Sequence, residues 1–124
     1  MNNKNKKIKP VVCYINAEKF KFTIYKQNKN KSGIYKWTNI KTGKFYIGSS
    51  MNLTERFKFY FCPKCLIGKL LKSRSYIYDS LLRDGYSNFN LEILEYCDVK
   101  ILLEREQYYF NILNPEYNIR KRIG

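Results

Sequence analysis

Two tyrosines stand beside glycines on two short apolar segments of the chain. Residues 33–35 read Gly-Ile-Tyr and residues 46–48 read Tyr-Ile-Gly, with a Lys-Thr-Gly turn between the segments. Gly43 in that turn suits the positive φ of a tight hairpin, so the two segments should pair as strands. The pairing would bring the hydroxyls of Tyr35 and Tyr46 together, where they could orient water or exchange protons.

An arginine and a glutamate interrupt the apolar face of two segments with helical periodicity. Arg56 lies three residues after Leu53, and Glu106 lies between Leu102 and Tyr109 on one stripe. A carboxylate on such a stripe is costly unless it is paired or bound to a cation. Structural explanations exist for both residues. Arg56 could cover apolar surface with its stem, and Glu106 could be a stripe-edge residue paired to Lys or Arg.

Together, paired hydroxyls, an inward guanidinium and an inward carboxylate fit the cleavage of a phosphodiester. That reaction needs a divalent cation, a group that activates water, and positive charge near the transition state. One carboxylate can hold one Mg²⁺ that keeps most of its waters. The chain has no histidine, so the proton acceptor must be a tyrosine, a lysine, a carboxylate or water. A catalytic tyrosine would need a nearby cation to lower its pKa from about 10.

The elements that must position these groups follow an α+β order. We expect strands over 33–40, 44–50 and 89–96. We expect helices over 53–61, 76–84 and 99–113, capped by Asn52, Ser75 and Asp98. A basic loop should fill 62–74, and 116–120 could add an edge strand. The expected fold is a small three-stranded antiparallel sheet flanked by helices.

This compact domain is expected over 33–120, between a basic N-terminal extension or arm (1–32) and a basic tail (121–124). The first ten residues should be disordered. The apolar runs at 11–15 and 20–25 could pair as an appended hairpin or form an extended arm, and the Lys/Asn run after them reads as a linker.

The composition favours a nucleic-acid partner. The 124 residues carry a net charge of +14, and 44% of them are hydrophobic, which is enough for a core. An anionic membrane surface is the alternative for such a charge, but no long basic amphipathic helix and no apolar run of about 18 residues is present. Neither a membrane nor a protein partner is implied.

Four cysteines include one closely spaced pair, Cys62 and Cys65, which is half of a zinc-site pattern. The other two, Cys13 and Cys97, are far apart in sequence. A four-cysteine zinc site is geometrically possible, but reduced thiols that bind no metal are the default, and no zinc is expected.

The ordered motifs resemble the GIY-YIG nuclease family. The resemblance rests on the two tripeptides, Arg56 eight residues after Gly48, Glu106 in "LLEREQYYF" and Asn118 in "NPEYNI", and it covers about 33–120. Beyond these motifs, "YSNFNLEILEYC" and "REQYYFNILNPEYNI" are similar to the catalytic domains of homing endonucleases carried by group I introns in fungal mitochondria.

The resemblance implies an Mg²⁺-dependent endonuclease that cleaves double-stranded DNA in a mitochondrion. Arg56 would stabilise the phosphate, Glu106 would bind the metal, Asn118 would support the site, and Tyr35 and Tyr46 would position or activate water. Tyr60 stands where some relatives have a histidine. The candidate DNA-binding residues are Lys44, Lys58, Lys69, Lys72 and Arg74, with Lys72 nearest to a second histidine of one branch.

A different class of function is the alternative. Intron-encoded relatives usually continue into a linker and a separate DNA-reading region, whereas this chain stops soon after Asn118. It could be a catalytically inactive, truncated nucleic-acid-binding remnant. The complete set of signature residues argues against decay.

Weak sequence preference and a steep dependence of DNA binding on salt are expected, because no helix of the expected domain is free to read base edges. About six phosphate contacts would give a log–log slope of about −5 on duplex DNA. Titrations at several salt concentrations, on a cognate-length duplex and a scrambled one, test this. Discrimination of about 10³ with a shallow slope would contradict it and reveal a reading element.

Overall fold

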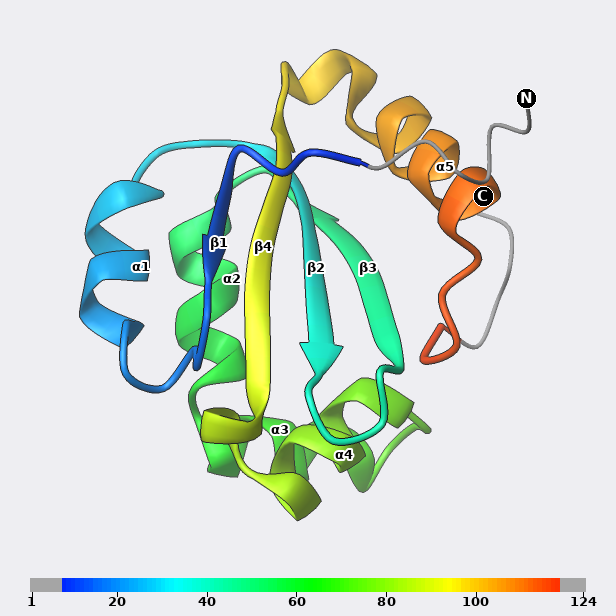
Figure 1. Cartoon of the computed structure of the whole chain (residues 1–124). Coiled ribbons are helices and arrows are strands. Elements are labelled where there is room, and N and C mark those ends of the chain that lie inside the picture. Colours follow the sequence, from blue (N-terminus) through cyan, green and yellow to red (C-terminus); the bar gives the residue numbers. More distant parts are fainter. Residues whose placement is uncertain (1–7, 119–124) are drawn as a thin grey trace.

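The structure is a computed structural model that describes residues 8–118. The tail at 121–124 and most of the first ten residues therefore lie outside the described residues. Figure 1 shows an antiparallel sheet with helices packed around it. Among residues 8–118, no helix has the length and apolar character needed to cross a membrane.

The sheet has four antiparallel strands, in the spatial order β1-β4-β2-β3. They are β1 (Val12–Tyr14), β2 (Gly33–Asn39), β3 (Phe45–Ser50) and β4 (Phe89–Tyr96). The α+β class and the three central strands agree with the sequence prediction. The expected strand count was one short, because β1 of the extension pairs with β4.

Five α-helices complete the described part of the chain: α1 (Lys21–Gln27), α2 (Leu53–Tyr60), α3 (Pro63–Leu70), α4 (Tyr76–Asp84) and α5 (Leu102–Leu113). Asn52 and Ser75 cap α2 and α4 as predicted, each accepting a hydrogen bond from a backbone N–H three residues on. Asp98 caps a short 3₁₀ turn that leads into α5.

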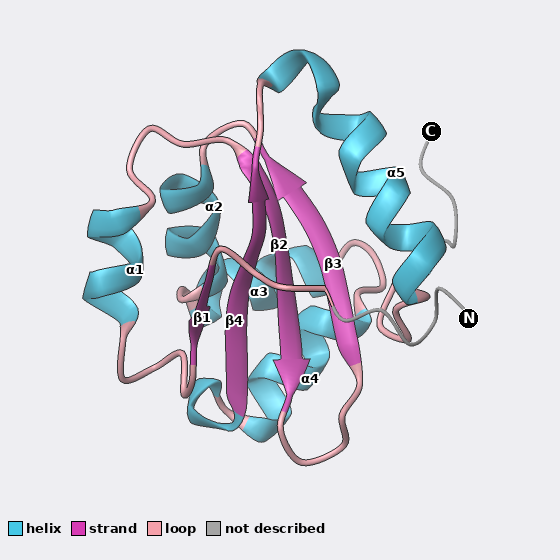
Figure 2. Cartoon of the chain, turned by 45° about the horizontal axis from the view of Figure 1, so that its top comes forward, coloured by secondary structure: helices cyan, strands magenta, loops and turns pink. Residues whose placement is uncertain are grey.

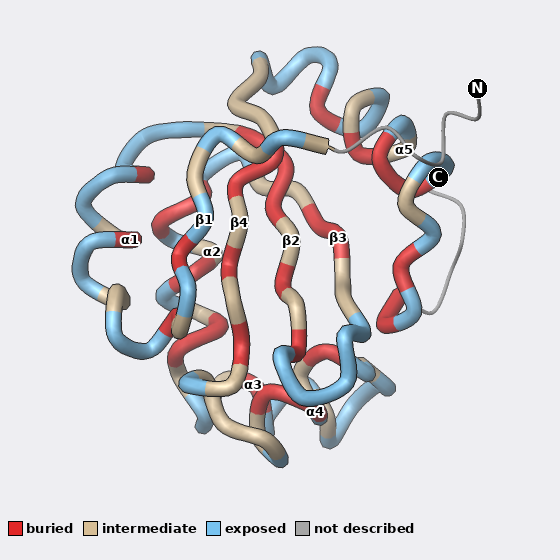
Figure 3. Tube along the Cα trace, in the orientation of Figure 1, coloured by how far each residue is buried: buried red, intermediate tan, exposed pale blue. Residues whose placement is uncertain are grey.

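Helices cover the two faces of the sheet unequally (Figure 2). The larger core lies between the sheet and α1 to α4, and it includes Tyr35, Trp37 and Phe57. A smaller core under α5 contains Ile34 and Ile47 from the alternate positions of β2 and β3. Figure 3 shows the buried residues along the strands and on the inner sides of the helices.

The prediction of an appended hairpin or an extended arm at 11–25 is wrong, because most of its second apolar run lies in α1. The apolar residues Phe20 and Ile24 are four apart, which suits one face of a helix, and Ile24 is fully buried. The expected linker at 26–31 is also ordered. Asn28 is fully buried, donates to the Tyr14 hydroxyl at 3.1 Å and accepts from the Tyr96 hydroxyl at 2.7 Å.

The predicted basic loop at 62–74 contains a helix, α3, which corrects the sequence analysis. Pro63 stands in the first turn of α3, where its missing N–H costs nothing, and Leu66 faces the core. The Cys62 Sγ caps this helix by accepting from the Cys65 N–H at 3.3 Å. The pair therefore has a structural explanation for its spacing. Within residues 8–118, no cluster of three or more His, Cys, Asp or Glu side chains could hold a metal.

The described part of the predicted edge strand, 116–118, is not a strand. It nevertheless runs along the outer edge of β3, where the Tyr117 N–H donates to the Phe45 carbonyl at 3.0 Å. Pro115 and the left-handed Asn114, with φ of 56°, end α5 just before it. Residues 119–120 lie outside the described residues.

Close backbone approaches explain both glycines beside the paired tyrosines. Tyr35 is opposite Gly48 in the β2–β3 pair, and a Cβ on Gly48 would lie 2.5 Å from the Tyr35 hydroxyl oxygen. A Cβ on Gly33 would lie 2.3 Å from the Glu95 carbonyl oxygen of β4. Each glycine thus admits a neighbour that any larger residue would displace.

Replacement of Gly48 by alanine should destabilise the fold by about 1–3 kcal/mol, the usual cost of overpacking. Tyr35 is fully buried, so its ring cannot move aside freely. Urea denaturation measures the change. Gly68→Ala is the matched control, since nothing lies within 4 Å of its added Cβ, and alanine inside α3 should stabilise by about 0.5–1 kcal/mol. Equal stability of Gly48→Ala and the unaltered protein would contradict this packing argument.

Candidate active site

A cluster of tyrosines forms the floor of the candidate site. The hydroxyls of Tyr35 and Tyr60 are 2.8 Å apart and hydrogen bonded, and both side chains are fully buried. The Tyr46 ring lies 6.4 Å from the Tyr35 ring, centroid to centroid, and remains partly exposed. β2, β3 and α2 therefore bring all three predicted tyrosines together, with Tyr46 nearest to solvent.

Arg56 on α2 lies at the rim of this cluster and is half-buried. Its guanidinium carbon is 5.9 Å from the centre of the Phe59 ring and 5.8 Å from that of Tyr60, within the range of cation–π attraction. The phenol oxygens of Tyr35, Tyr60 and Tyr78 raise the pKa of Arg56, so this side chain stays charged. A fixed, partly desolvated cation is thus available to an anion.

Glu106 on α5 is buried, with 8% of its surface exposed. The Ser49 hydroxyl donates a hydrogen bond to Glu106 Oε1, but no salt bridge involves Glu106 among the described residues. Arg105, its neighbour, instead binds Glu95 through a salt bridge of 2.7 Å. Within the described residues, Glu106 is therefore not the stripe-edge residue paired to Lys or Arg that the structural explanation assumed.

Arg56 and Glu106 come from helices on opposite faces of the sheet and approach each other at the end of β3. In Figure 2, α5 lies beside β3 while α2 lies on the far side. A shallow pocket of about 500 Å³ at this point is lined by Arg56, by Ser49 and Ser50 of β3, and by Leu102 of α5. The charge of Arg56 also acts on Glu106 and on Tyr46. Ser49 lines the pocket and also donates to Glu106, so both groups border one candidate site at the edge of the sheet.

Burial dominates the titration of the site. Desolvation raises the pKa of Tyr35, Tyr46 and Tyr60, and the nearby charge of Arg56 offsets this only in part. Desolvation likewise raises the pKa of Glu106, against the hydrogen bond from Ser49 and the charge of Arg56. The tyrosines are therefore neutral hydroxyls at physiological pH, and the cation-lowered phenol pKa considered from the sequence is not found.

Asn118 supports the site from the edge of β3. Its Oδ1 accepts from the Ile47 N–H at 3.0 Å, and its Nδ2 donates to the Ile47 carbonyl at 2.9 Å. The side chain thereby pairs with β3 as a neighbouring strand would. Both polar ends of Asn118 are used in this contact, so it positions the strand between Tyr46 and Gly48.

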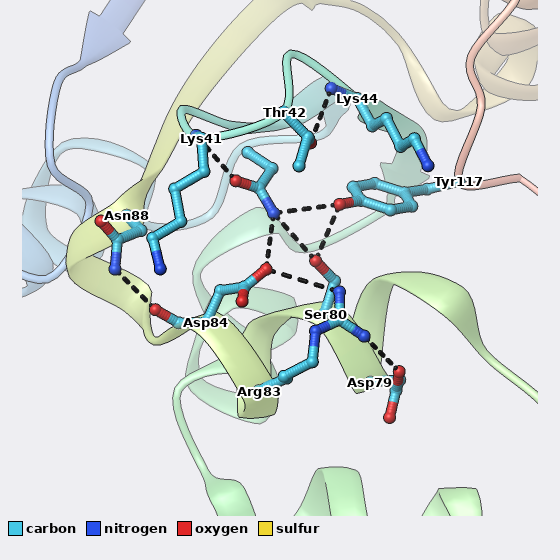
Figure 4. A network of polar contacts seen from close by, with 10 residues as sticks. Lys41, Thr42, Lys44, Asp79, Ser80, Arg83, Asp84, Asn88 and Tyr117 are labelled. Carbon is cyan, nitrogen blue, oxygen red and sulfur yellow. Dashed lines mark hydrogen bonds and ion pairs between the residues drawn. The ribbon is translucent and has the colours of Figure 1, made fainter.

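A buried network holds the segment that carries Asn118 (Figure 4). The Tyr117 hydroxyl is 2.8 Å from Ser80 Oγ and accepts from Asn39 Nδ2 at 3.1 Å. Asn39 also donates to Asp84 at 2.8 Å, which lowers the pKa of that carboxyl. Asn39 ends β2, and Ser80 and Asp84 lie on α4. The network therefore joins β2, α4 and the segment that carries Asn118.

The candidate DNA-binding residues are all exposed, and none of them lines the pocket that Arg56 lines. Lys58 pairs with Glu55 at 3.8 Å on α2. Lys44 lies beside Tyr117 on the β2–β3 side, in a separate shallow pocket. Lys69 is on α3, while Lys72 and Arg74 follow it. Their contact with DNA stays a prediction.

Sequence reasoning missed two neighbours of the site, Ser49 and Tyr78. Ser49 lies two residues after Ile47 on β3 and therefore shares its face toward α5, a placement that the strand period and a known partner helix would have given. The ring centre of Tyr78 on α4 lies 5.7 Å from that of Tyr60. The phenol of Tyr78 also contributes to raising the pKa of Tyr35 and of Arg56. Its position depends on how α4 packs against α2, which no local pattern reveals.

Comparison with known proteins agrees with this geometry. The family model described as the GIY-YIG catalytic domain matches residues 31–118, which is most of the chain. The chain belongs to the GIY-YIG family. It is therefore a nuclease, and nucleases of the GIY-YIG family generally use a divalent metal ion.

Two solved structures of the GIY-YIG family resemble the chain, both at 30% sequence identity. One is the catalytic domain of intron endonuclease I-TevI in which one glutamate is replaced by alanine. It has a TM-score of 0.59, and the match covers 75% of this chain and 97% of that one. The other is the catalytic domain of homing endonuclease I-TevI, with a TM-score of 0.57 and coverage of 73% and 99%.

Replacement of Glu106 by glutamine should stabilise the metal-free protein at pH 8 by about 1 kcal/mol. The folded-state pKa of Glu106 lies above its ordinary value. The carboxyl therefore favours folding below its unfolded pKa, and this contribution is lost as the pH rises through the folded pKa. The gain from Glu106→Gln should accordingly vanish near pH 4.

Urea denaturation in EDTA at both pH values measures this difference. Glu104→Gln, on the exposed side of the same helix, should show no such pH-dependent gain. A loss of stability for Glu106→Gln at pH 8 would show that ionised Glu106 supports the fold instead.

Proposed function

We propose that this GIY-YIG nuclease is an Mg²⁺-dependent endonuclease that hydrolyses double-stranded DNA, as the catalytic part of an intron-encoded homing endonuclease. The observation that carries the proposal is Glu106. It is a buried carboxylate without a salt bridge among the described residues, it accepts a hydrogen bond from Ser49, which lines the same pocket as Arg56, and the charge of Arg56 acts on its pKa. A core residue serving only the fold would gain from being apolar.

Glu106 is the residue that would hold the metal ion. One of its oxygens accepts from Ser49, which fixes the carboxylate and leaves the other oxygen without a hydrogen bond among the described residues. Such a donor set fits Mg²⁺, which binds through one or two carboxylates and keeps several waters. When bound, the ion supplies positive charge to the phosphate and lowers the pKa of a bound water.

Arg56 would bind a non-bridging oxygen of the scissile phosphate. Its planar guanidinium matches two phosphate oxygens, and the rings of Phe59 and Tyr60 restrict its motion. During hydrolysis a water oxygen bonds to phosphorus and the bond from phosphorus to the leaving oxygen breaks. The negative charge on the non-bridging oxygens is greatest between these events, where a fixed cation helps most.

The tyrosines would act as neutral hydroxyls. Tyr46 is the one with access to solvent, so it would hydrogen bond to the attacking water or to the phosphate. Tyr35 is buried with its hydroxyl on Tyr60, so it would orient its neighbours and not touch the substrate. With no histidine in the chain, the proton of the attacking water would pass to solvent, either directly or with Tyr46 accepting it as it releases its own proton, and the leaving oxygen would take a proton from solvent.

The DNA substrate and the intron setting draw support from different sources. The net charge of +14 favours a polyanion. The solved structures that the chain resembles are catalytic domains of an intron endonuclease and of a homing endonuclease, and we propose the same role here. A mitochondrial setting, by resemblance to intron-borne relatives, is part of the proposal.

Purified protein should nick supercoiled plasmid DNA in Mg²⁺ and not in EDTA. Arg56→Ala should lower the rate by about 10²–10³-fold, the usual effect of losing one oxyanion contact. Glu106→Ala should lose at least as much, because it removes the metal site. Gel quantification of nicked and linear plasmid measures both effects.

Glu104→Ala is the matched control, since it removes an exposed carboxylate from the same helix and should nick at the unaltered rate. Thermal melts of each variant separate a lost site from a lost fold. Salt-sensitive DNA binding without cleavage in any divalent cation would contradict the proposal and favour an inactive binding remnant.

A further inference from the structure

The segment at 8–30 lies ahead of the region that the family model matches, 31–118, yet it is an ordered part of the fold. β1 adds a strand to β4, and Ala17 and Ile24 are fully buried. The Tyr14 hydroxyl donates to Gln27 Oε1 at 2.7 Å, which ties β1 to the end of α1. The surface that this extension presents is therefore fixed relative to the sheet.

A hydrogen bond joins the extension to the helical turn that carries Arg56, because Thr54 Oγ1 donates to the Tyr25 carbonyl at 2.7 Å. The Leu53 N–H donates to the carbonyl of Lys31, the residue that follows the extension, at 2.9 Å. Figure 1 shows α1 beside α2 at the border of the sheet. A movement of α1 relative to the active site is thereby restrained at the first turn of α2.

A groove of about 420 Å³ runs between α1 and α2. Lys26, Lys29 and Lys58 line it, against one acidic side chain, Glu55. Glu55 is engaged by Lys58 at 3.8 Å. Lys26 and Lys29 are exposed and form no salt bridge among the described residues. The charges in the groove that no salt bridge neutralises among the described residues are therefore positive.

An exposed aromatic ring lies at the same groove. Phe22 lines it with 76% of its surface in contact with solvent, and its ring centre is 6.0 Å from that of Tyr25. A large apolar side chain left in water beside unpaired lysines matches the backbone of a nucleic-acid strand, in which phosphates alternate with the apolar edges of sugars.

The groove is continuous with the active-site pocket, because Asn52 and Glu55 line both. A DNA strand with its scissile phosphate on Arg56 would thus pass from one to the other without leaving the surface. This inference rests on the proposed function, since it concerns the DNA on which that site acts.

We propose that the groove between α1 and α2 is a binding site for the sugar-phosphate backbone of duplex DNA next to the scissile phosphate. Lys26 and Lys29 contact phosphates there, and Phe22 packs against the sugar edge of the same strand. Phosphate contacts of this kind position the duplex and carry no base information.

The test compares two double variants of the full chain with equal loss of charge. Lys26→Gln/Lys29→Gln alters the groove. Lys19→Gln/Lys41→Gln is the matched control, because both lysines are exposed and neither lines the groove or the active-site pocket. Fluorescence anisotropy with a duplex of about 30 base pairs in EDTA gives the salt dependence of binding.

Each lost phosphate contact should reduce the log–log salt slope by about 0.9, so the groove variant should be shallower by about 1.8. The control should keep the slope of the unaltered protein. In Mg²⁺, the groove variant should need more DNA to reach half-maximal nicking while its rate at saturating DNA is retained. A hydroxyl-radical footprint should lose protection on one side of the nick in the groove variant alone.

Other outcomes distinguish the two proposals. If the unaltered protein binds and nicks DNA but the groove variant keeps its slope and footprint, this inference fails and the proposed function stands. An equal change in both double variants would trace the effect to net charge and would also overturn it. If the unaltered protein does not bind DNA at all, both proposals fail.

Discussion

The phenol of Tyr35 fills the space that a side chain at position 48 would need, and the site is arranged around this contact. Because Gly48 lies opposite Tyr35 in the register of β2 and β3, the ring can cross the partner strand and reach Tyr60 on α2. Tyr60 in turn lies beside Arg56. One missing Cβ thus sets the distance between the hairpin and the helix that carries the cation.

The second constraint is the pairing of charges on α5. Arg105 and Tyr109 both bind Glu95, which satisfies that carboxylate and lowers its pKa. Among the described residues, Glu106 receives one hydrogen bond, from Ser49, and the charge of Arg56 lowers its pKa without offsetting its burial. Two adjacent residues of α5 therefore have opposite effects on stability. Arg105 stabilises the contact between α5 and β4, whereas Glu106 is a desolvated carboxylate that disfavours folding. Such a residue makes sense where a ligand supplies the missing interaction.

Local rules were enough for the central strands, the capped helices α2 and α4, and the signature residues, because turn glycines, capping side chains and a fixed motif act over a few residues. They failed where tertiary packing decides. In the run at 20–25, apolar and polar residues alternate enough to suggest a strand. Ile24 on α1 and Asn28 at its end are nevertheless buried, and this burial depends on packing against α2 and the sheet, which lie elsewhere in the sequence. Ser49 and the network around Tyr117 depend on contacts between residues more than 35 positions apart.

The segment that carries Asn118 also closes one border of the sheet. β3 is an edge strand, and the outward N–H and carbonyl groups of Phe45 and Ile47 are all occupied, by Glu116, Tyr117 and Asn118. Unpaired groups on such an edge are a template for strand addition from another chain. The opposite edge, β1, is only three residues long. Asn118, which positions β3, therefore also helps to keep this edge of the sheet from pairing with another chain and aggregating.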